Sequence, residues 1–208
     1  MTVAILAVNV ALFLYEVFLP SPQGERFIYK FAVIPLEFKT GGNLSFSPGL
    51  PPFLSVFTAM FLHGGWFHII GNMLYLWIFG DNVEERMGSI RFLLFYLLCG
   101  VVATFAQIYG SFSSKIPALG ASGAIAGVLA AYLRLFPKAK IAVLVPIFYF
   151  LRAVVLPAWV VLGLWILLQI LQVQLTPAKE TGGIAYFAHI GGFVAGLLFM
   201  PIFVRRRR

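Results

Sequence analysis

The sequence predicts an all-α polytopic membrane protein, a single bundle of six transmembrane helices. Only 11% of its 208 residues are charged, whereas a soluble domain usually has about a quarter. Hydrophobic residues make up 61% of the chain, and its mean hydropathy is +0.96. Apolar runs of about 18 residues, long enough to cross a bilayer as a helix, recur along nearly the whole sequence. We therefore expect one membrane domain over 1–208 and no separate soluble domain.

The six predicted spans cover about 2–19, 53–80, 92–109, 116–136, 154–171 and 184–204. The first lacks the basic start and the small-residue cleavage site of a signal peptide, so we interpret it as a retained span. The apolar stretch 141–151 is too short to cross a hydrocarbon core of roughly 30 Å as a helix. We interpret it as an interfacial or packed connector, and a seventh span is the weaker alternative.

The positive charge of the chain lies between the predicted spans and at the C-terminus. A net charge of +8 could suit nucleic acid, but topology and anionic lipid explain this placement better. With the N-terminus inside, the inner segments hold ten cations, Arg86, Arg91, Arg134, Lys138, Lys140, Arg152 and Arg205 to Arg208, and the outer segments hold five, Arg26, Lys30, Lys39, Lys115 and Lys179. This bias predicts a multi-pass protein of the cell (inner) membrane with both termini in the cytoplasm. The lipid bilayer is an expected partner, and nucleic acid is not.

A hydroxyl and an imidazole occupy matching positions in two predicted spans. Ser122 lies in Gly120-Ala121-Ser122-Gly123, near the start of the fourth apolar run, and His189 lies near the start of the sixth. Polar groups in hydrocarbon are costly and usually face the bundle interior or a wet cavity. A serine hydroxyl becomes a good nucleophile when a base removes its proton, and His189 is a candidate for that base. The pair predicts hydrolytic chemistry inside the membrane.

Two further polar residues fall at a similar depth. Counted from the inner ends of their spans at about 1.5 Å per residue, Ser122 and His68 stand roughly 18 Å and 20 Å high. Asn72 follows His68 by one helical turn and shares its face. Both side chains carry donors for the oxyanion that forms in acyl transfer. The glycines beside Ser122, including Gly120, allow a substrate backbone to approach closely. We expect the site in the outer half of the membrane.

No acid lies in the spans that carry Ser122 and His189. The seven acids of the chain are Glu16, Glu25, Glu37, Asp81, Glu84, Glu85 and Glu180. Only Glu180, in the loop before the sixth span, could approach His189. The sequence therefore predicts a Ser122–His189 dyad whose imidazole is oriented by packing and by other hydrogen bonds.

Small residues recur at every fourth position in the same two spans. They are Gly123, Gly127 and Ala131 in the fourth span, and Ala188, Gly192 and Gly196 in the sixth. Such stripes let helix backbones approach one another closely. We expect these two helices to pack together, with His189 facing a neighbouring helix rather than lipid.

Three motifs occur in a fixed order along the chain. They are His63-Gly-Gly-Trp-Phe-His68-Ile-Ile-Gly-Asn72-Met73 in the second span, Gly120-Ala121-Ser122-Gly123 with Gly127 in the fourth, and Ala188-His189-Ile-Gly-Gly192-Phe-Val-Ala-Gly196 in the sixth. Together they resemble the motifs of the rhomboid intramembrane serine proteases, and the likeness extends over about 57–198. Glu84-Glu85-Arg86-Met87-Gly88 is similar to an inner-loop pattern of that family. The Trp-Arg pair that many members carry in the first outer loop is missing from 21–52.

The resemblance implies a minimal six-span rhomboid bundle. It also implies hydrolysis of peptide bonds within or beside the transmembrane segments of single-span client proteins, near the outer face. Ser122 would be the nucleophile and His189 the general base and acid. His68, Asn72 and Gly120 would bind the oxyanion and the substrate. The resemblance further implies that the reaction uses no metal and no cofactor, and that His63 has a structural or loop-positioning role.

Three alternatives to a serine peptidase remain open at this point, an inactive client-binding protein, a metal site and a transporter. An inactive relative that only binds clients would typically lack the serine or the histidine, and both are present. His63, His68 and His189 could instead ligate a metal ion, although no acid or thiol is placed to assist them. A transporter would be favoured by paired repeats with interrupted helices, and we find no convincing repeat.

Overall fold

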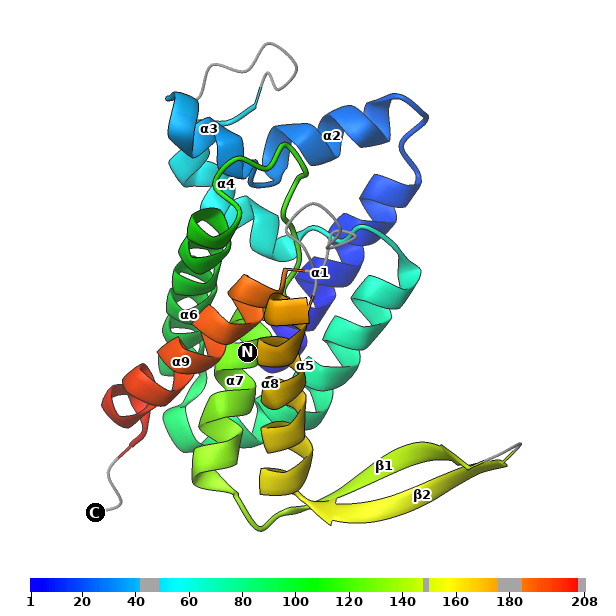
Figure 1. Ribbon diagram of the computed structural model, residues 1–208, viewed down its shortest axis with the longest axis vertical. Coiled ribbons are helices and arrows are strands. Elements are labelled where there is room, and N and C mark those ends of the chain that lie inside the picture. Colours follow the sequence, from blue (N-terminus) through cyan, green and yellow to red (C-terminus); the bar gives the residue numbers. More distant parts are fainter. Residues whose placement is uncertain (42–48, 148–149, 176–184, 206–208) are drawn as a thin grey trace.

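The computed structural model describes residues 1–41, 49–147, 150–175 and 185–205. Its elements are α1 (Thr2–Val17), α2 (Gln23–Phe31), α3 (Pro35–Thr40), α4 (Pro52–Thr58), the 3-10 turn η1 (Ala59–Phe61), α5 (Trp66–Met87), α6 (Ser89–Gly110), α7 (Ser122–Leu135), β1 (Lys140–Ile147), β2 (Phe150–Pro157), α8 (Ala158–Leu175) and α9 (Tyr186–Phe203). Figure 1 shows one helical bundle, with α2, α3 and α4 at one end and the β1–β2 hairpin projecting sideways from the other. The predicted helical class is confirmed, with a two-stranded hairpin added to it.

Several of these helices can cross a membrane. By length and composition, α6, α8 and α9 each qualify, and the bent pair made by residues 52–61 and α5 is a fourth candidate. The helices α1 and α7 are apolar but shorter. The described part of the chain therefore contains three or four candidate spans, and the count of six stays a prediction that depends on α1 and α7.

The second predicted span, 53–80, is not one continuous helix. The chain forms α4 and η1, breaks at 62–65, and turns by 79° into α5. Gly64 and Gly65 lie in the break, and glycine is a poor helix former because ordering its backbone costs more entropy. Because the helix restarts at Trp66, His68 and Asn72 lie in its first two turns.

The fifth predicted span began too early, at 154. Residues 140–147 pair with residues 150–157 as antiparallel strands, with Lys140 opposite Pro157, and α8 begins only at Ala158. Valine and isoleucine make up half of β1, and β2 contains two valines; these residues favour extended backbone. Pro146 also lacks the backbone donor that a helix interior requires. The described residues of the connector, 141–147 and 150–151, are therefore part of two paired strands.

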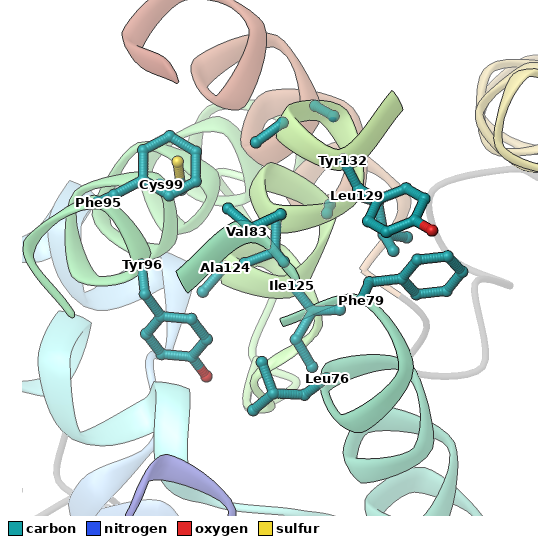
Figure 2. Close-up of a cluster of buried hydrophobic side chains, with 14 of the residues drawn as sticks. Leu76, Phe79, Val83, Phe95, Tyr96, Cys99, Ala124, Ile125, Leu129 and Tyr132 are labelled. Carbon is teal, nitrogen blue, oxygen red and sulfur yellow. The ribbon is translucent and has the colours of Figure 1, made fainter. Parts of the chain in front are cut away.

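The central helix of the bundle is α7. Every residue from Gly123 to Tyr132 is buried. Figure 2 shows the side chains around it: Leu76, Phe79 and Val83 of α5, and Phe95, Tyr96 and Cys99 of α6, beside Ala124, Ile125, Leu129 and Tyr132 of α7 itself. The helix that begins at Ser122 is thus held by apolar packing from neighbouring helices.

Glycines bring α9 directly onto α7. A Cβ atom at Gly192 would overlap the carbonyl oxygen of Gly123, and one at Gly196 would overlap that of Gly127. A Cβ at Gly127 would also come within 2.5 Å of the Cβ of Cys99 in α6. The close packing predicted for the two small-residue stripes is confirmed, and it fixes the position of α9 relative to α7.

Backbone hydrogen bonds fix the segment that leads into α7. Val33, which is completely buried, pairs with Ala118 as an antiparallel bridge. Two residues further on, the Gly120 N–H donates to the carbonyl of Ala59 at 2.8 Å. Val33, between α2 and α3, and Ala59 of the η1 turn therefore fix the position of residues 118–120, which lead into Ser122.

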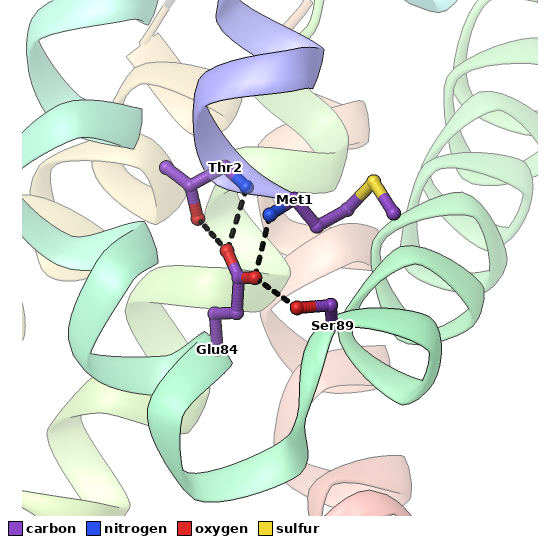
Figure 3. A network of polar contacts seen from close by, with 4 residues as sticks. All are labelled: Met1, Thr2, Glu84 and Ser89. Carbon is purple, nitrogen blue, oxygen red and sulfur yellow. Dashed lines mark hydrogen bonds and ion pairs between the residues drawn. The ribbon is translucent and has the colours of Figure 1, made fainter.

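At the other end of the bundle, Glu84 ties three helices together (Figure 3). Its carboxylate accepts hydrogen bonds from the Thr2 N–H at 2.6 Å, the Thr2 hydroxyl at 2.8 Å and the Ser89 hydroxyl at 2.5 Å, and it pairs with the Met1 ammonium at 2.5 Å. A carboxylate at the start of α1 also interacts favourably with the helix dipole. Glu84 thus joins the end of α5 to the beginnings of α1 and α6.

Candidate active site

Ser122 and His189 are in direct contact. Ser122 is the first residue of α7, and His189 lies in the first turn of α9. The Ser122 Oγ lies 2.9 Å from the His189 Nε2, a distance at which a base can take a proton from a hydroxyl. The glycine contacts between α7 and α9 thus bring together the two residues that the sequence analysis paired.

The other ring nitrogen of His189 is bonded to α8. His189 Nδ1 lies 2.7 Å from the Oε1 of Gln169. The Nε2 of Gln169 donates to the Trp165 carbonyl at 3.4 Å, which fixes the orientation of the amide. The Trp165 ring packs beside the imidazole, with 5.7 Å between ring centroids and an interplanar angle of 40°. Helix α8 therefore both bonds and packs against the histidine.

These contacts select one tautomer of a neutral His189. An amide oxygen can only accept a hydrogen bond, so Nδ1 carries the proton that is shared with Gln169. Nε2 is then unprotonated and accepts the hydroxyl proton of Ser122. The imidazole is oriented by an amide and a ring, whereas Glu180 lies outside the described residues.

Gly120 lies against His68 and Asn72, two residues before Ser122. A Cβ on Gly120 would come 2.7 Å from the Cε1 and Nε2 atoms of His68 and 3.7 Å from the Nδ2 of Asn72. Gly120 also has a φ of +122°, a conformation that is readily available only to glycine. Both the space and the backbone conformation therefore require glycine at this position.

The same corner of the site offers hydrogen-bond donors. The Asn72 Nδ2 is buried and has no partner among the described residues, an arrangement that costs about 1–3 kcal/mol. Ser122 begins a helix, where backbone N–H groups lack partners within the helix and the helix dipole is positive. With the imidazole of His68, these groups are suited to a negatively charged oxygen.

A cavity of about 670 Å³ contains all four predicted polar side chains. Ser122, His189, His68 and Asn72 line it, and apolar and aromatic side chains such as Trp165 complete its walls. This volume lies in the range of ligand-binding cavities. The serine–histidine pair therefore faces a cavity large enough for a ligand.

A second, much smaller hollow of about 30 Å³ also touches Ser122. Gln107 and Thr104 of α6 contribute polar groups to its lining. A cavity needs about 10–15 Å³ of this kind of volume to hold one water molecule. The hollow is therefore large enough for water next to the serine.

The remaining predicted residues lie apart from the cavity. His63 is completely buried in the break before α5, and its ring centroid is 5.1 Å from that of His68, so it contacts a cavity residue without lining the cavity. Cys99 is buried at the contact between α6 and α7. In the described ranges, no three His, Cys, Asp or Glu side chains are grouped so that they could hold a metal ion.

Sequence reasoning missed Gln169 and Trp165. The available signal was the presence of an amide in a strongly apolar span, because a polar side chain in hydrocarbon usually has a partner within the bundle. Its partner could not be identified, since α8 is apolar on nearly all sides and its sequence pattern does not show which face turns toward α9.

The fold and site define a helical membrane protein with a serine–histidine pair beside a cavity. Residues 52–206 match the family model described as Rhomboid domain. Rhomboid protein 1, mitochondrial, of Saccharomyces cerevisiae is 28% identical over 201 residues, covering 94% of this chain and 51% of its own. Presenilin-associated rhomboid-like protein A, mitochondrial, of Danio rerio is 31% identical over 185 residues, covering 86% and 42%. Rhomboid protease GluP of Bacillus subtilis is 45% identical over 76 residues, covering 36% and 14%.

The chain belongs to the rhomboid family, in agreement with the resemblance of its motifs. It spans about half, or less, of the length of these relatives. The matched region contains all of the residues that line the candidate site.

Proposed function

We propose that this protein is an intramembrane serine endopeptidase that cleaves the transmembrane segments of single-span membrane proteins. The observation that carries the proposal is the 2.9 Å contact between Ser122 Oγ and His189 Nε2, with His189 Nδ1 bonded to Gln169. Membership of the rhomboid family supports it, since one relative is named a protease.

The proposed reaction begins when Ser122 attacks the carbonyl carbon of the scissile peptide bond. Its hydroxyl proton moves to His189 Nε2 as the Oγ–C bond forms. When the C–N bond breaks, the same proton passes to the leaving amine. A water molecule then hydrolyses the acyl-enzyme ester and gives up a proton to His189, which returns it to the Ser122 oxygen.

The negative oxygen of the tetrahedral intermediate would lie in the corner formed by His68, Asn72 and the start of α7. The Asn72 Nδ2 has no partner among the described residues, so an oxyanion can accept its hydrogen bond without displacing another. Donors arranged in this way favour the transition state over the ground state. Gly120 keeps a side chain out of the space that His68 occupies.

The substrate would be a transmembrane helix that unwinds locally. Helical carbonyls are bonded within the helix, so a peptide bond must leave the helix before Ser122 can attack it. Helix-breaking residues such as glycine and proline lower the cost of this step. We therefore propose clients that have such residues near the membrane boundary.

We also propose that the protein lies in the cell (inner) membrane with both termini in the cytoplasm and the site toward the outer face. Met1 contacts Glu84 in the last turns of α5, and the Arg205 N–H donates to the nearby Arg86 carbonyl at 3.1 Å. The two ends of the described chain are therefore at the same end of the bundle. The bias of Lys and Arg residues toward that end supports its cytoplasmic assignment.

The test is cleavage of a panel of single-span substrates by the purified protein in liposomes, beside Ser122→Ala. We expect the unsubstituted protein to yield fragments cut within or beside the spans, and Ser122→Ala to yield none. Equal cleavage by the two proteins would contradict the proposal. The inactive client-binding alternative would instead predict capture of uncut substrate by both.

A further inference from the structure

The β1–β2 hairpin is the part of the protein that the proposed chemistry does not use. It projects sideways from the bundle between α7 and α8 (Figure 1). A two-stranded hairpin that packs against nothing is marginally stable in water. Its position therefore raises the question of what surface covers it.

One face of the hairpin is apolar and exposed. The strand register places Ala142 opposite Val155 and Leu144 opposite Ala153 on this face. Leu144 is 67% exposed and Val155 is 59% exposed, and the neighbouring Leu151 is 70% exposed. An exposed apolar patch of this kind marks a surface that meets a membrane or a protein.

Four cations lie on and around the hairpin, with Lys140 at the base of this face and Arg152, opposite Val145, on the other face. Arg134, Lys138, Lys140 and Arg152 are all exposed. None of them forms an ion pair with an acid in the part of the chain that the structure describes. The sequence contains no Asp or Glu between Met87 and Lys179, so no acid within that stretch offsets these cations.

We propose that the hairpin lies on the anionic lipid headgroups of the bilayer that holds the bundle. Its apolar face would contact the acyl boundary, and Lys138, Lys140 and Arg152 would contact the phosphate groups. Apolar side chains next to cations are the combination that binds negatively charged membrane surfaces. The inference stands independently of the proposed peptidase activity.

The hairpin lies at the depth that this role requires. Arg86 lies over the ring of Phe136 at 5.8 Å, and the Arg205 N–H donates to the Arg86 carbonyl. The base of the hairpin therefore lies at the end of the bundle to which the cation bias assigns the cytoplasmic surface. The outer edges of its strands expose backbone donors and acceptors that hydrocarbon cannot satisfy, so it lies among headgroups and water rather than in the core.

Contact with lipid would be transmitted to α8. The Ala158 N–H donates to the Ala139 carbonyl at 2.8 Å, and the Trp159 N–H donates to the Pro137 carbonyl at 3.1 Å. These bonds close the base of the hairpin and join it to the first turn of α8. A hairpin bound to headgroups therefore also fixes the depth of this helix.

The test uses the purified full chain with Leu144→Cys, labelled with a polarity-sensitive dye; because Cys99 is buried, the unsubstituted chain serves as the labelling blank. The protein is reconstituted in phosphatidylcholine with or without phosphatidylglycerol. We expect blue-shifted emission, quenched by nitroxides placed just below the headgroups, and a stronger effect with phosphatidylglycerol. Emission typical of water in both bilayers would overturn the proposal.

A charge variant tests the role of the cations. The variant combines Lys138→Gln, Lys140→Gln and Arg152→Gln. We expect each lost cation to weaken the binding of the hairpin to the anionic headgroups by about fivefold. The matched control removes Arg26, Lys30 and Lys39 at the other end of the bundle and should leave the dye signal unchanged. Thermal unfolding in detergent checks that both variants fold.

Two further outcomes would overturn the proposal. One is a dye signal that is unchanged in the hairpin charge variant. The other is protection of the dye that disappears when the protein is diluted into excess lipid, since this would identify a second copy of the chain as the partner.

Discussion

Helices α7 and α8 both contact His189, but they are held in very different ways. In α7, every residue from Gly123 to Tyr132 is buried. In α8, Ala158 and Leu162 are the buried residues, and one side of the helix exposes large apolar side chains such as Trp159. Ser122 therefore lies at the start of a helix whose residues are nearly all buried. Gln169, the hydrogen-bond partner of His189, lies in a helix with few buried residues.

The difference in packing between α7 and α8 matches two separate requirements of the site, a fixed distance between Ser122 and His189 and a cavity wall that can yield. Proton transfer from Ser122 to His189 requires a fixed distance, and the glycine contacts between α7 and α9 supply it. The cavity, which in the proposed function admits a peptide, is bounded partly by Trp165 of α8. A loosely packed wall can yield to a substrate more easily than a wall of interlocked backbones. The predictions below test this division, from the largest expected effect to the smallest.

The largest effect is expected for Asn72→Ala, in the corner of the site that lies beside the start of α7. The substitution removes one donor from the proposed oxyanion site, and we expect kcat to fall by about 10²–10³-fold. KM should change little, because the bond strengthens mainly in the transition state. Steady-state cleavage of a single-span substrate in detergent measures both constants. A kcat equal to that of the unsubstituted protein would remove Asn72 from the site.

Gly192→Ala tests the contact between α7 and α9. Its Cβ would overlap the backbone carbonyl of Gly123, which cannot rotate away, so we expect a loss of about 3 kcal/mol in unfolding free energy. The matched control is Gly163→Ala in α8, where the new Cβ would meet nothing within 4 Å. The control should be neutral or more stable by up to about 1 kcal/mol.

Unfolding in mixtures of detergent and dodecyl sulfate gives both free energies. Equal effects of the two substitutions would show that the packing of α7 and α8 does not differ as described.

Gln169→Leu tests the loosely packed wall. It removes the acceptor for His189 Nδ1, which is worth about 1 kcal/mol for a neutral hydrogen bond. We expect kcat to fall by roughly fivefold with KM nearly unchanged. Gln169→Glu keeps an acceptor at the same distance and should restore much of the rate. A loss of equal size in both variants would indicate a purely structural role for Gln169.

The sequence predicted the well-packed half of the site better than the loosely packed half. The stripe from Gly123 to Gly127 signals a close contact without knowledge of the partner, because only small residues allow it. His68 and Asn72 share a face through their spacing alone. Their contact with Gly120 could not be foreseen, since it depends on the hydrogen bond between Gly120 and Ala59.

Two features resisted prediction for physical reasons. The break before α5 interrupts a run that is apolar on both sides, and hydropathy alone does not register a turn of 79°. The hairpin has the composition of a membrane span, and its identity depends on pairing between residues 140–147 and 150–157. Because this pairing ends at Pro157, it also sets where α8 begins.

The most direct test of the account is labelling with a fluorophosphonate, which reacts with serines that a neighbouring base activates. We predict that the purified protein is labelled on Ser122, as mapped by mass spectrometry of its peptides. Ser122→Ala should not be labelled, and His189→Ala should react far more slowly while it unfolds at an unchanged temperature. Labelling of Ser122 at the same rate in His189→Ala would contradict the claim that His189 activates the serine.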